Sequence, residues 1–491
     1  MVLHKKATFY VTFYIFPRLI YMRLQILLMS AFALVTFQLF ASADTTIIEK
    51  HLSKKQLNDD VSYLTSTNER VHPNMYHSIS KQTYQQLTDS VRKALRDGMT
   101  ERQAWPIMAR LVGALNEGHS LFNYPDSVVN QLKNGAHLLF PVLIQEFNGK
   151  NLVVRGDLSA EDKLIAGDQI TAINGINSSE LVDKLSGYAG GLKTYRSIDV
   201  CRNLITYLYL YNINSPYTIN YLRNGQPSSV TLKAINWSEL RANAKERGKA
   251  FLAAPIYADY SFKYLDPKTA HLSINSLTAE PDVFKSFLDS CFNSLQHTTT
   301  SKLIIDLRRN GGGNSQLAQA LLGYITDKPF RMTGGVRWKV SQEYKDQLNR
   351  NMDGKGPEKM GYYFNATNRS ILADTSIKTT SAERNPLRYR GKVFVLIGAH
   401  TFSSANMLAN TIQDYKLATL VGEPSGEPAN DYGELITLTL PNTGFTFSTS
   451  TKQFIRANGN VKDVLPVLPE YKVVDDLSTS HDEVIDFLKN R

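Results

Sequence analysis

The feature that most constrains the fold is a run of three glycines between two apolar segments. In LIIDLRRNGGGNSQLAQALLGYI, residues 303–325, the first apolar residues predict a short buried strand, and the spacing after Ser315 predicts a helix. Glycine loses more conformational freedom on folding than any other residue, so three in succession are costly. They are kept where φ must be positive or where the backbone approaches another group closely. The sequence therefore predicts a strand-to-helix turn of bare backbone.

Strand and helix patterns alternate around this turn. Strands are predicted at 270–274, 302–307, 392–398, 418–422 and 434–440, and helices at 281–295, 315–325 and 404–415. Strands and helices that succeed one another imply an α/β layer with parallel strand pairs.

Other parts of the chain have different patterns. Residues 44–135 carry apolar residues at three- and four-residue steps, which predicts an N-terminal helical domain with a helix ending at Gly118. Short β-type runs predict a β-rich domain over 136–236. The α/β core then spans 237–475, with a polar surface insertion at about 330–390 and a C-terminal tail at 476–491.

The first 43 residues are predicted to be a signal peptide. A basic start at Met22 is followed by an apolar run and by Ala41-Ser42-Ala43, which is a small-x-small cleavage site. Export to the periplasm or the extracellular space, with cleavage after Ala43, is expected. An uncleaved membrane anchor is the alternative, and the start at Met1 or Met22 stays open.

Composition narrows the possible partners. The net charge is +10 without a long basic block, which argues against nucleic-acid binding. Hydrophobic residues make up 42%, as in an ordinary globular protein. No Cys/His cluster has the spacing of a zinc site, so no metal is expected. Cys201 and Cys291 are expected to be free, buried thiols of different domains, although an exported protein could pair them.

A second strand-to-helix junction carries a candidate nucleophile. In VFVLIGAHTFSSANMLANTIQDY, residues 393–415, a strand ends at Gly398 and a helix begins near Ser404, which exposes Ser403 at the carboxyl edge of the sheet. Amides at a helix start point outward, where they can hold an oxyanion. Ser403 alone would be an ordinary N-cap. The glycine turn lies at the same edge, however, so the two loops can converge.

These stretches carry a family resemblance. DLRRNGGGN, followed by TFSSANMLANTIQDY and GEPSG, resembles the C-terminal processing, or tail-specific, peptidases, which include tricorn-like members. GDQITAINGINSSELVDKL, residues 167–185, resembles a PDZ domain. The resemblance implies an α/β multidomain protein with a helical segment, a PDZ-like domain that binds peptide ends, and a ClpP/crotonase-like serine protease core. No cofactor is implied.

Matching the motifs also assigns residues. The resemblance makes Ser403 the nucleophile and the amide of Ser404 one oxyanion donor. Gly311 or Gly312 would give the other donor, and Asn310 would brace the turn.

The general base separates two branches of this family. Tail-specific members carry a lysine after the GEP stretch, but Pro428 stands at that position here, which disfavours a Ser/Lys pair. Tricorn-like members use a histidine in a D-G-H-[ST] motif. LNEGHS, residues 115–120, resembles that motif, with Glu117 in place of aspartate, and makes His119 the base. The alternatives are a histidine that only decorates a helix C-terminus, and Lys452 as a remote base.

The acid that would orient the imidazole is less defined. The family places an acid before a Pro-Asp near the end of the core, which here indicates Asp463 before Pro469-Glu470. Glu434 is the alternative acid, and Ser120 could also hold the imidazole.

The sequence thus predicts an exported serine peptidase that acts on peptides or proteins and contacts the membrane only through an uncleaved signal segment. The alternative is a catalytically inactive family member that acts as a peptide-binding scaffold in the cell envelope. Departures from the family pattern at Glu117, Asn406 and Glu470 keep that alternative open.

Overall fold

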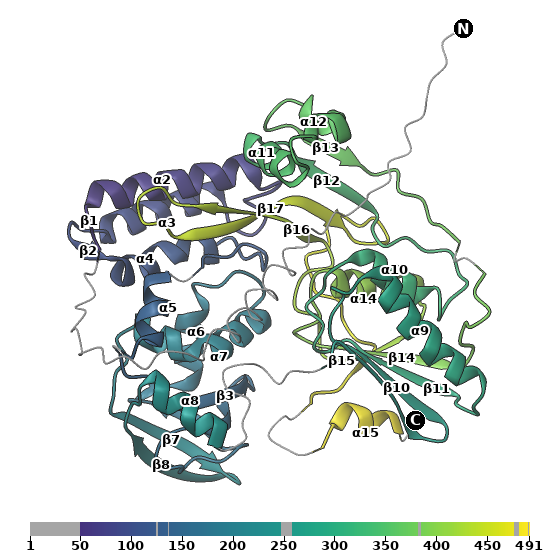
Figure 1. Ribbon diagram of the computed structural model, residues 1–491, viewed down its shortest axis with the longest axis horizontal. Helices are drawn as coiled ribbons and strands as arrows, with labels where there is room; N and C mark the ends of the chain where they lie inside the picture. The colour runs from purple at the N-terminus through teal and green to yellow at the C-terminus, as the bar shows by residue number, and fades with distance from the viewer. Residues whose placement is uncertain are drawn as a thin grey trace, which may run out of the picture.

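The computed structural model describes residues 50–123, 126–135, 137–246, 258–381, 384–475, 481–489 and 491. The predicted signal peptide, residues 1–43, lies outside the described residues. The N-terminal helices and the β-rich domain lie on one side of the molecule, and the α/β core lies on the other (Figure 1).

The N-terminal part is helical, as its apolar spacing predicts. Its elements are β1 (His51–Leu52), α2 (Lys54–Val71), α3 (Lys81–Ala94), β2 (Met99–Thr100), α4 (Glu101–Gly113) and α5 (Asp126–Lys133). The side chain of Thr100 caps α4 in a capping box with Gln103. The helix ends at Gly113 and not at Gly118, because turns follow it and Asn116 adopts a left-handed φ of 57°.

The β-rich domain is one sheet covered by helices. The strand order is β3-β4-β5-β7-β8, with β6 paired to β5. The strands are β3 (Val142–Phe147), β4 (Leu152–Asp157), β5 (Gln169–Ile173), β6 (Ile176–Asn177), β7 (Tyr217–Arg223) and β8 (Gln226–Leu232). The helices are α6 (Ser178–Ser186), α7 (Lys193–Leu210) and α8 (Trp237–Glu246). Strand β3 forms one edge of the sheet, and α7 packs against it.

The α/β core is a six-stranded sheet of order β18-β15-β14-β11-β10-β9, parallel except for β9. Its strands are β9 (Tyr260–Asp266), β10 (Thr269–Ile274), β11 (Lys302–Asp306), β14 (Lys392–Ile397), β15 (Thr419–Gly422) and β18 (Tyr471–Lys472). Helices α9 (Pro281–Gln296), α10 (Ser315–Leu322) and α14 (Ser404–Tyr415) share one core with the sheet. Helix α15 (Glu483–Lys489), in the predicted tail, packs in a separate core with strand residues such as Ile304 and Leu396.

A second, antiparallel sheet of order β13-β12-β17-β16 adjoins this core. Its strands are β12 (Gly335–Lys339), β13 (Ile371–Asp374), β16 (Asp431–Thr439) and β17 (Thr446–Ile455). Helices α11 (Gln342–Asn351), α12 (Gly356–Lys359) and α13 (Gly361–Phe364) connect β12 to β13. Residues 330–390, which the sequence indicated as a surface insertion, thus include two strands of this sheet and pack around Trp338, Tyr344 and Tyr363.

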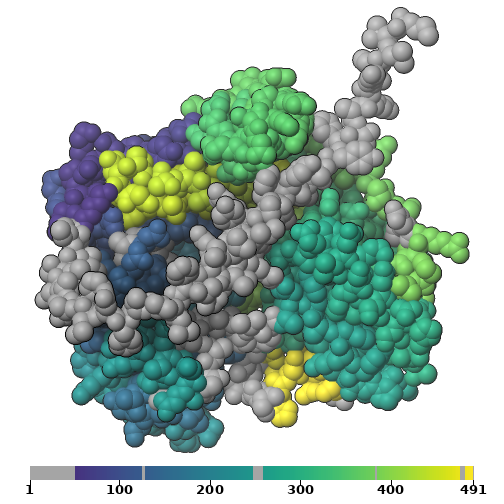
Figure 2. Space-filling model, in the orientation of Figure 1, coloured from purple at the N-terminus to yellow at the C-terminus, as the bar shows by residue number. Residues whose placement is uncertain are grey.

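The β16–β17 hairpin joins the two sides of the molecule. Its tip residues Leu440, Phe445 and Phe447 belong to the same hydrophobic core as the N-terminal helices. The amide of Asn123 donates to Thr446 O, and the amide of Ser448 donates to Leu121 O, both at 2.8 Å. In the space-filling view the hairpin lies directly against the N-terminal helices (Figure 2). Residues 121–123 are therefore anchored on a strand of the core.

The expectation for the cysteines is confirmed. Cys201 and Cys291 are both free and buried, and they lie in different hydrophobic cores. Within the described ranges, no helix is both long and apolar enough to cross a membrane.

Candidate active site

Ser403 lies on a sharp turn between β14 and α14. Its φ of 52° and ψ of −126° are unusual for a residue other than glycine, and such backbone strain costs about 1–3 kcal/mol. The surrounding loop holds the turn in place. Thr401 Oγ1 donates to Leu307 O at 2.9 Å, and the Phe402 amide donates to Asn310 O at 3.0 Å. The strained turn lifts Ser403 out of the regular helix at the carboxyl edge of the sheet.

The glycine loop approaches Ser403 directly, which explains its composition. Gly312 has a φ of +98°, and a Cβ added there would lie 2.6 Å from Ser403 Cβ and 2.9 Å from Ser404 N. The buried Asn310 braces the loop, because its Nδ2 donates to Ile274 O and its Oδ1 accepts from the Gly312 amide. Only glycine fits at position 312, since any side chain would collide with the residue that carries the hydroxyl.

Two backbone amides remain available beside this hydroxyl. The Gly312 amide is already bonded to Asn310 Oδ1. The amides of Gly311 and Ser404 donate no hydrogen bond within the described part of the chain. The Ser404 side chain donates to Gly313 O at 2.6 Å, which ties the start of α14 to the glycine loop. Of the two glycines that the sequence suggested as donors, Gly311 therefore has the free amide.

His119 reaches this edge from the N-terminal side of the molecule. Its Nδ1 lies 3.3 Å from Glu117 Oε1 and 3.7 Å from Glu427 Oε2. The other oxygen of Glu427 accepts a short hydrogen bond from the Ser403 amide. The imidazole also packs on Phe402, with ring centroids 4.7 Å apart. One carboxyl group thus contacts both the imidazole and the backbone of the serine.

Glu117 is a buried carboxylate that accepts several hydrogen bonds. It accepts from the His119 amide and from Ser120 Oγ, both at 2.6 Å, and from Ser450 Oγ at 3.3 Å. His72 Nε2 lies 3.8 Å away. Burial alone would raise the pKa of this carboxyl, but the interactions with His119 and His72 hold it well below its usual range. Glu117 is therefore ionised at neutral pH.

Glu427 has the opposite electrostatic state. Burial and the nearby charge of Asp431 raise the pKa of Glu427 well above its usual range. Sequence reasoning missed this residue. Its position directly before Pro428, where relatives carry a lysine, was the signal that could have drawn attention to it. The imidazole thus faces one ionised carboxyl and one neutral carboxyl.

The acids suggested by the sequence lie elsewhere. Asp463 forms a short ion pair with Arg456. Glu434 accepts from the Tyr344 hydroxyl at 2.6 Å and lies 3.4 Å from Lys452 Nζ. Neither acid contacts His119 among the interactions of the described residues.

The contacts of Ser120 and Lys452 also do not match the roles that the sequence suggested for them. The Ser120 hydroxyl donates to Glu117 and not to the imidazole ring. Lys452 lies over the Trp338 ring, 4.0 Å from its centroid, in the cluster around Glu434.

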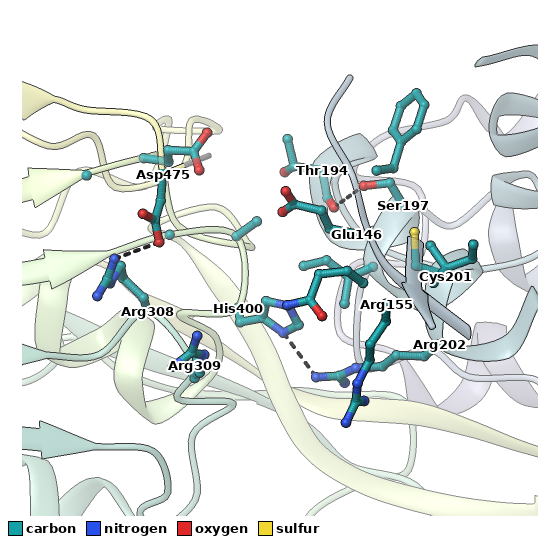
Figure 3. A pocket seen from close by; sticks show the side chains of 18 of the residues that line it. Glu146, Arg155, Thr194, Ser197, Cys201, Arg202, Arg308, Arg309, His400 and Asp475 are labelled. Atoms are coloured by element: carbon teal, nitrogen blue, oxygen red, sulfur yellow. Dashed lines mark hydrogen bonds and ion pairs between the residues drawn. The ribbon is translucent and has the colours of Figure 1, made fainter. Parts of the chain in front are cut away.

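A cavity of about 670 Å³ opens beside the nucleophile loop, between the β-rich domain and the core. Strand β3 and helix α7 line one side, and the loops after β14 and β15 line the other. Figure 3 shows His400 inside it, with Arg309 on one side and Arg202 on the other. Burial and the two arginines lower the pKa of His400 to about 3, so the ring is neutral. Its Nδ1 therefore accepts from the Arg202 guanidinium at 3.1 Å.

The described parts of the chain hold no group of three or more side chains that could bind a metal ion. At the carboxyl edge of the parallel sheet, Glu427 contacts both the Ser403 amide and the His119 ring, and the amides of Gly311 and Ser404 make no hydrogen bond in the described residues. A serine, a histidine and unused amides are the groups that serine hydrolases use.

Residues 268–473 match the model of peptidase family S41. This match, together with the arrangement above, makes the chain a serine-type peptidase, and the resemblance predicted from the motifs is confirmed.

Solved structures support the fold. Mature CPAF complexed with lactacystin superposes with a TM-score of 0.62 at 15% identity, over 85% of this chain and 94% of that chain. Mature CPAF gives a TM-score of 0.59 at 15% identity, over 85% and 92% of the two chains. At this level of identity the likeness concerns the fold alone. A search of the curated proteins finds no match.

Proposed function

We propose that the chain is an exported peptidase of the tail-specific and tricorn-like type, with Ser403 as the nucleophile and His119 as the general base. One observation carries the proposal: the Glu427 carboxyl accepts a hydrogen bond from the Ser403 amide and lies 3.7 Å from His119 Nδ1, so it joins the two residues. The bare Gly311 and Ser404 amides beside the hydroxyl support it.

The chemistry follows from these groups. Ser403 Oγ attacks the scissile carbonyl carbon, and His119 takes its proton and returns it to the leaving amine. Water then hydrolyses the acyl-enzyme with the same base. The Gly311 and Ser404 amides donate to the oxyanion, and each such donor lowers the barrier by about 3 kcal/mol. The ionised Glu117 stabilises the imidazolium that forms. In this proposal Glu117 takes the role that the sequence suggested for Asp463 or Glu434.

The substrate would be a peptide or protein. Strand β3 has an unpaired edge along the cavity, and an extended peptide can add to such an edge as a further strand. In this proposal the PDZ-like domain captures a substrate segment there, in the cavity that His400, three residues before Ser403, also lines.

Labelling with a fluorophosphonate and hydrolysis of an unfolded protein substrate test the chemistry. We expect Ser403→Ala and His119→Ala to abolish labelling and to lower hydrolysis at least 10³-fold. Ser286→Ala and His297→Ala, both exposed on or beside α9, are the matched controls and should behave as wild type. Labelling of a folded His119→Ala variant at the wild-type rate would refute the base. Absence of labelling in the folded wild type would favour the scaffold alternative.

Export has a separate test. Expression of the full chain in a bacterial host, followed by fractionation and mass spectrometry of the N-terminus, should recover a periplasmic or secreted chain that begins at Asp44. A chain retained in the cytoplasm with its first residues intact would contradict this part of the proposal.

A further inference from the structure

The His119 ring lacks the hydrogen bond that usually orients a catalytic imidazole. A histidine base commonly donates from its second nitrogen to a carboxylate or carbonyl, which fixes the ring. His119 Nδ1 is buried and makes no hydrogen bond within the described residues. Glu117 and Glu427 lie near enough to the ring for charge interaction. The short hydrogen bonds that Glu117 accepts, however, come from the His119 amide and Ser120 Oγ. The charge of Glu117 attracts the ring at 3.3 Å, but without a well-aligned hydrogen bond a further contact is needed to fix the orientation of the ring.

Aromatic packing supplies the missing constraint. Phe402, the residue directly before Ser403, lies between two rings. Its centroid is 4.7 Å from that of His119, and it is 4.3 Å from that of Tyr195 with only 12° between the planes. Ring pairs at such distances attract beyond their buried area. Tyr195 comes from the first turn of α7, so a residue of the β-rich domain forms the outer layer of the stack.

The surrounding backbone leaves the three rings little freedom. A Cβ at Gly118 would lie 2.6 Å from the Phe402 ring and 3.4 Å from the Tyr195 ring. A Cβ at Gly426 would lie 2.2 Å from Ala399 O and 3.3 Å from the Tyr195 ring. The His119 loop, the nucleophile loop and the loop of Glu427 are therefore packed around the stack without room for a methyl group.

We propose that Tyr195 is a positioning residue, which through Phe402 holds the His119 ring in its working orientation. This inference rests on the proposed role of His119 as base. Tyr195 does not line the neighbouring cavity, and its ring stacks on Phe402. It acts on the base through the Phe402 ring, and it also packs beside Gly118, the residue directly before His119. A displacement of a catalytic group by about 1 Å can cost about 100-fold in rate, which sets the scale of the effect.

Steady-state kinetics of Tyr195 variants test the proposal. Tyr195→Ala should lower kcat about 10- to 100-fold while KM changes less than about twofold, because the ring orients the base and does not touch substrate. Tyr195→Phe, which keeps the flat ring, should recover kcat to within about threefold of wild type. Tyr195→Leu keeps the apolar bulk, and its kcat should fall as much as that of Tyr195→Ala. It provides the test if the Ala variant fails to fold.

Two further variants show whether the effect passes through Phe402. Phe402→Leu should lower kcat similarly, and its combination with Tyr195→Leu should cost no more than the larger single loss, since both break one stack. Tyr211→Ala removes an equivalent ring from the far end of α7 and should leave kcat unchanged.

The outcomes separate this inference from the proposed function. If His119→Ala stays active, the proposed base is wrong and the positioning role falls with it. If His119→Ala is inactive but folded Tyr195→Leu stays within threefold of wild type, the positioning role alone is overturned. A loss that appears in KM, that Phe does not restore or that Tyr211→Ala reproduces would also overturn it.

Discussion

The two halves of the proposed active site, the nucleophile half around Ser403 and the base half around His119, are built in different ways. The nucleophile half lies on consecutive loops of the α/β core, and hydrogen bonds fix almost every part of it. Asn310 alone bonds Ile274, Gly312 and Phe402. The base half arrives from the N-terminal side of the molecule. There the imidazole has a buried nitrogen that makes no hydrogen bond to any residue the structure describes, and ring packing and nearby carboxyl groups surround it.

This difference determines where the site tolerates change. Directional hydrogen bonds and close backbone approach allow the nucleophile half few alternatives, because a shifted donor or an added methyl group collides or is left unpaired. Packing and charge hold the base half less specifically. Substitutions there should therefore lower the rate of hydrolysis less than substitutions in the nucleophile half.

The largest effect is expected where the nucleophile half is tightest. Gly312→Ala places a methyl group 2.6 Å from Ser403 Cβ at a φ of +98°, and we expect hydrolysis to fall about 10³-fold or more. Gly311→Ala is the matched substitution, because a Cβ there meets nothing within 4 Å, and it should cost at most a few-fold. Specific activity and the melting temperature of both variants provide the measurement. Equal losses at the two positions would break the comparison.

In the base half we expect a smaller difference, between the losses of kcat caused by replacing each of its two carboxyl groups. Glu117 is ionised, so Glu117→Gln removes the charge opposite the imidazolium and should lower kcat about 10²-fold. Glu427 is neutral, and Glu427→Gln keeps an acceptor for the Ser403 amide, so kcat should change less than about fivefold. Kinetics at pH 7 with both variants decide the point. A greater loss in Glu427→Gln would mean that Glu427 carries the charge.

The smallest effect concerns stability at the contact between the β-rich domain and the core. Folded His400 stays neutral down to about pH 3, whereas an unfolded histidine takes up a proton near pH 6.5. As pH falls below 6.5 the unfolded state gains a proton that the folded state does not, so the free energy of unfolding falls. Between pH 6.5 and 4.5 we expect a loss of about 2 kcal/mol that His400→Asn abolishes.

Denaturant unfolding of wild type and His400→Asn at several pH values measures this difference. Arg202→Ala removes one of the two charges that keep His400 neutral and should reduce the dependence on pH. Parallel pH curves for wild type and His400→Asn would contradict the assignment.

The sequence predicted the nucleophile half well because its information is local. The three glycines directly follow one predicted strand, and Ser403 lies between another predicted strand and a predicted helix; the structure has β11, β14 and α14 at these places. The predicted strand 434–440 does not belong to the parallel layer, because it is part of β16 in the antiparallel sheet. The family resemblance suggested Ser404 and either Gly311 or Gly312 as oxyanion donors, and of the two glycines only Gly311 has an amide that makes no hydrogen bond in the described residues.

The base half was harder because its contacts join distant segments. His119 could be suggested from a short motif, but Glu427 and Tyr195 become its neighbours only through the packing of three domains. The acids that motif spacing suggested, Asp463 and Glu434, are drawn to Arg456 and to Tyr344, partners that no local pattern reveals. The polar composition of residues 330–390 likewise concealed two strands, because their apolar partners lie on β17.

The β16–β17 hairpin sets the order in which this enzyme can be completed during synthesis. The segment that follows His119 is fastened by Thr446 and Ser448, which leave the ribosome after both the base and the nucleophile have been made. We expect a nascent chain, or one truncated before Thr446, to carry every reacting group and yet cleave nothing, because its first third has no strand to dock on. Such late fastening would keep a peptidase silent until almost its last residues have emerged.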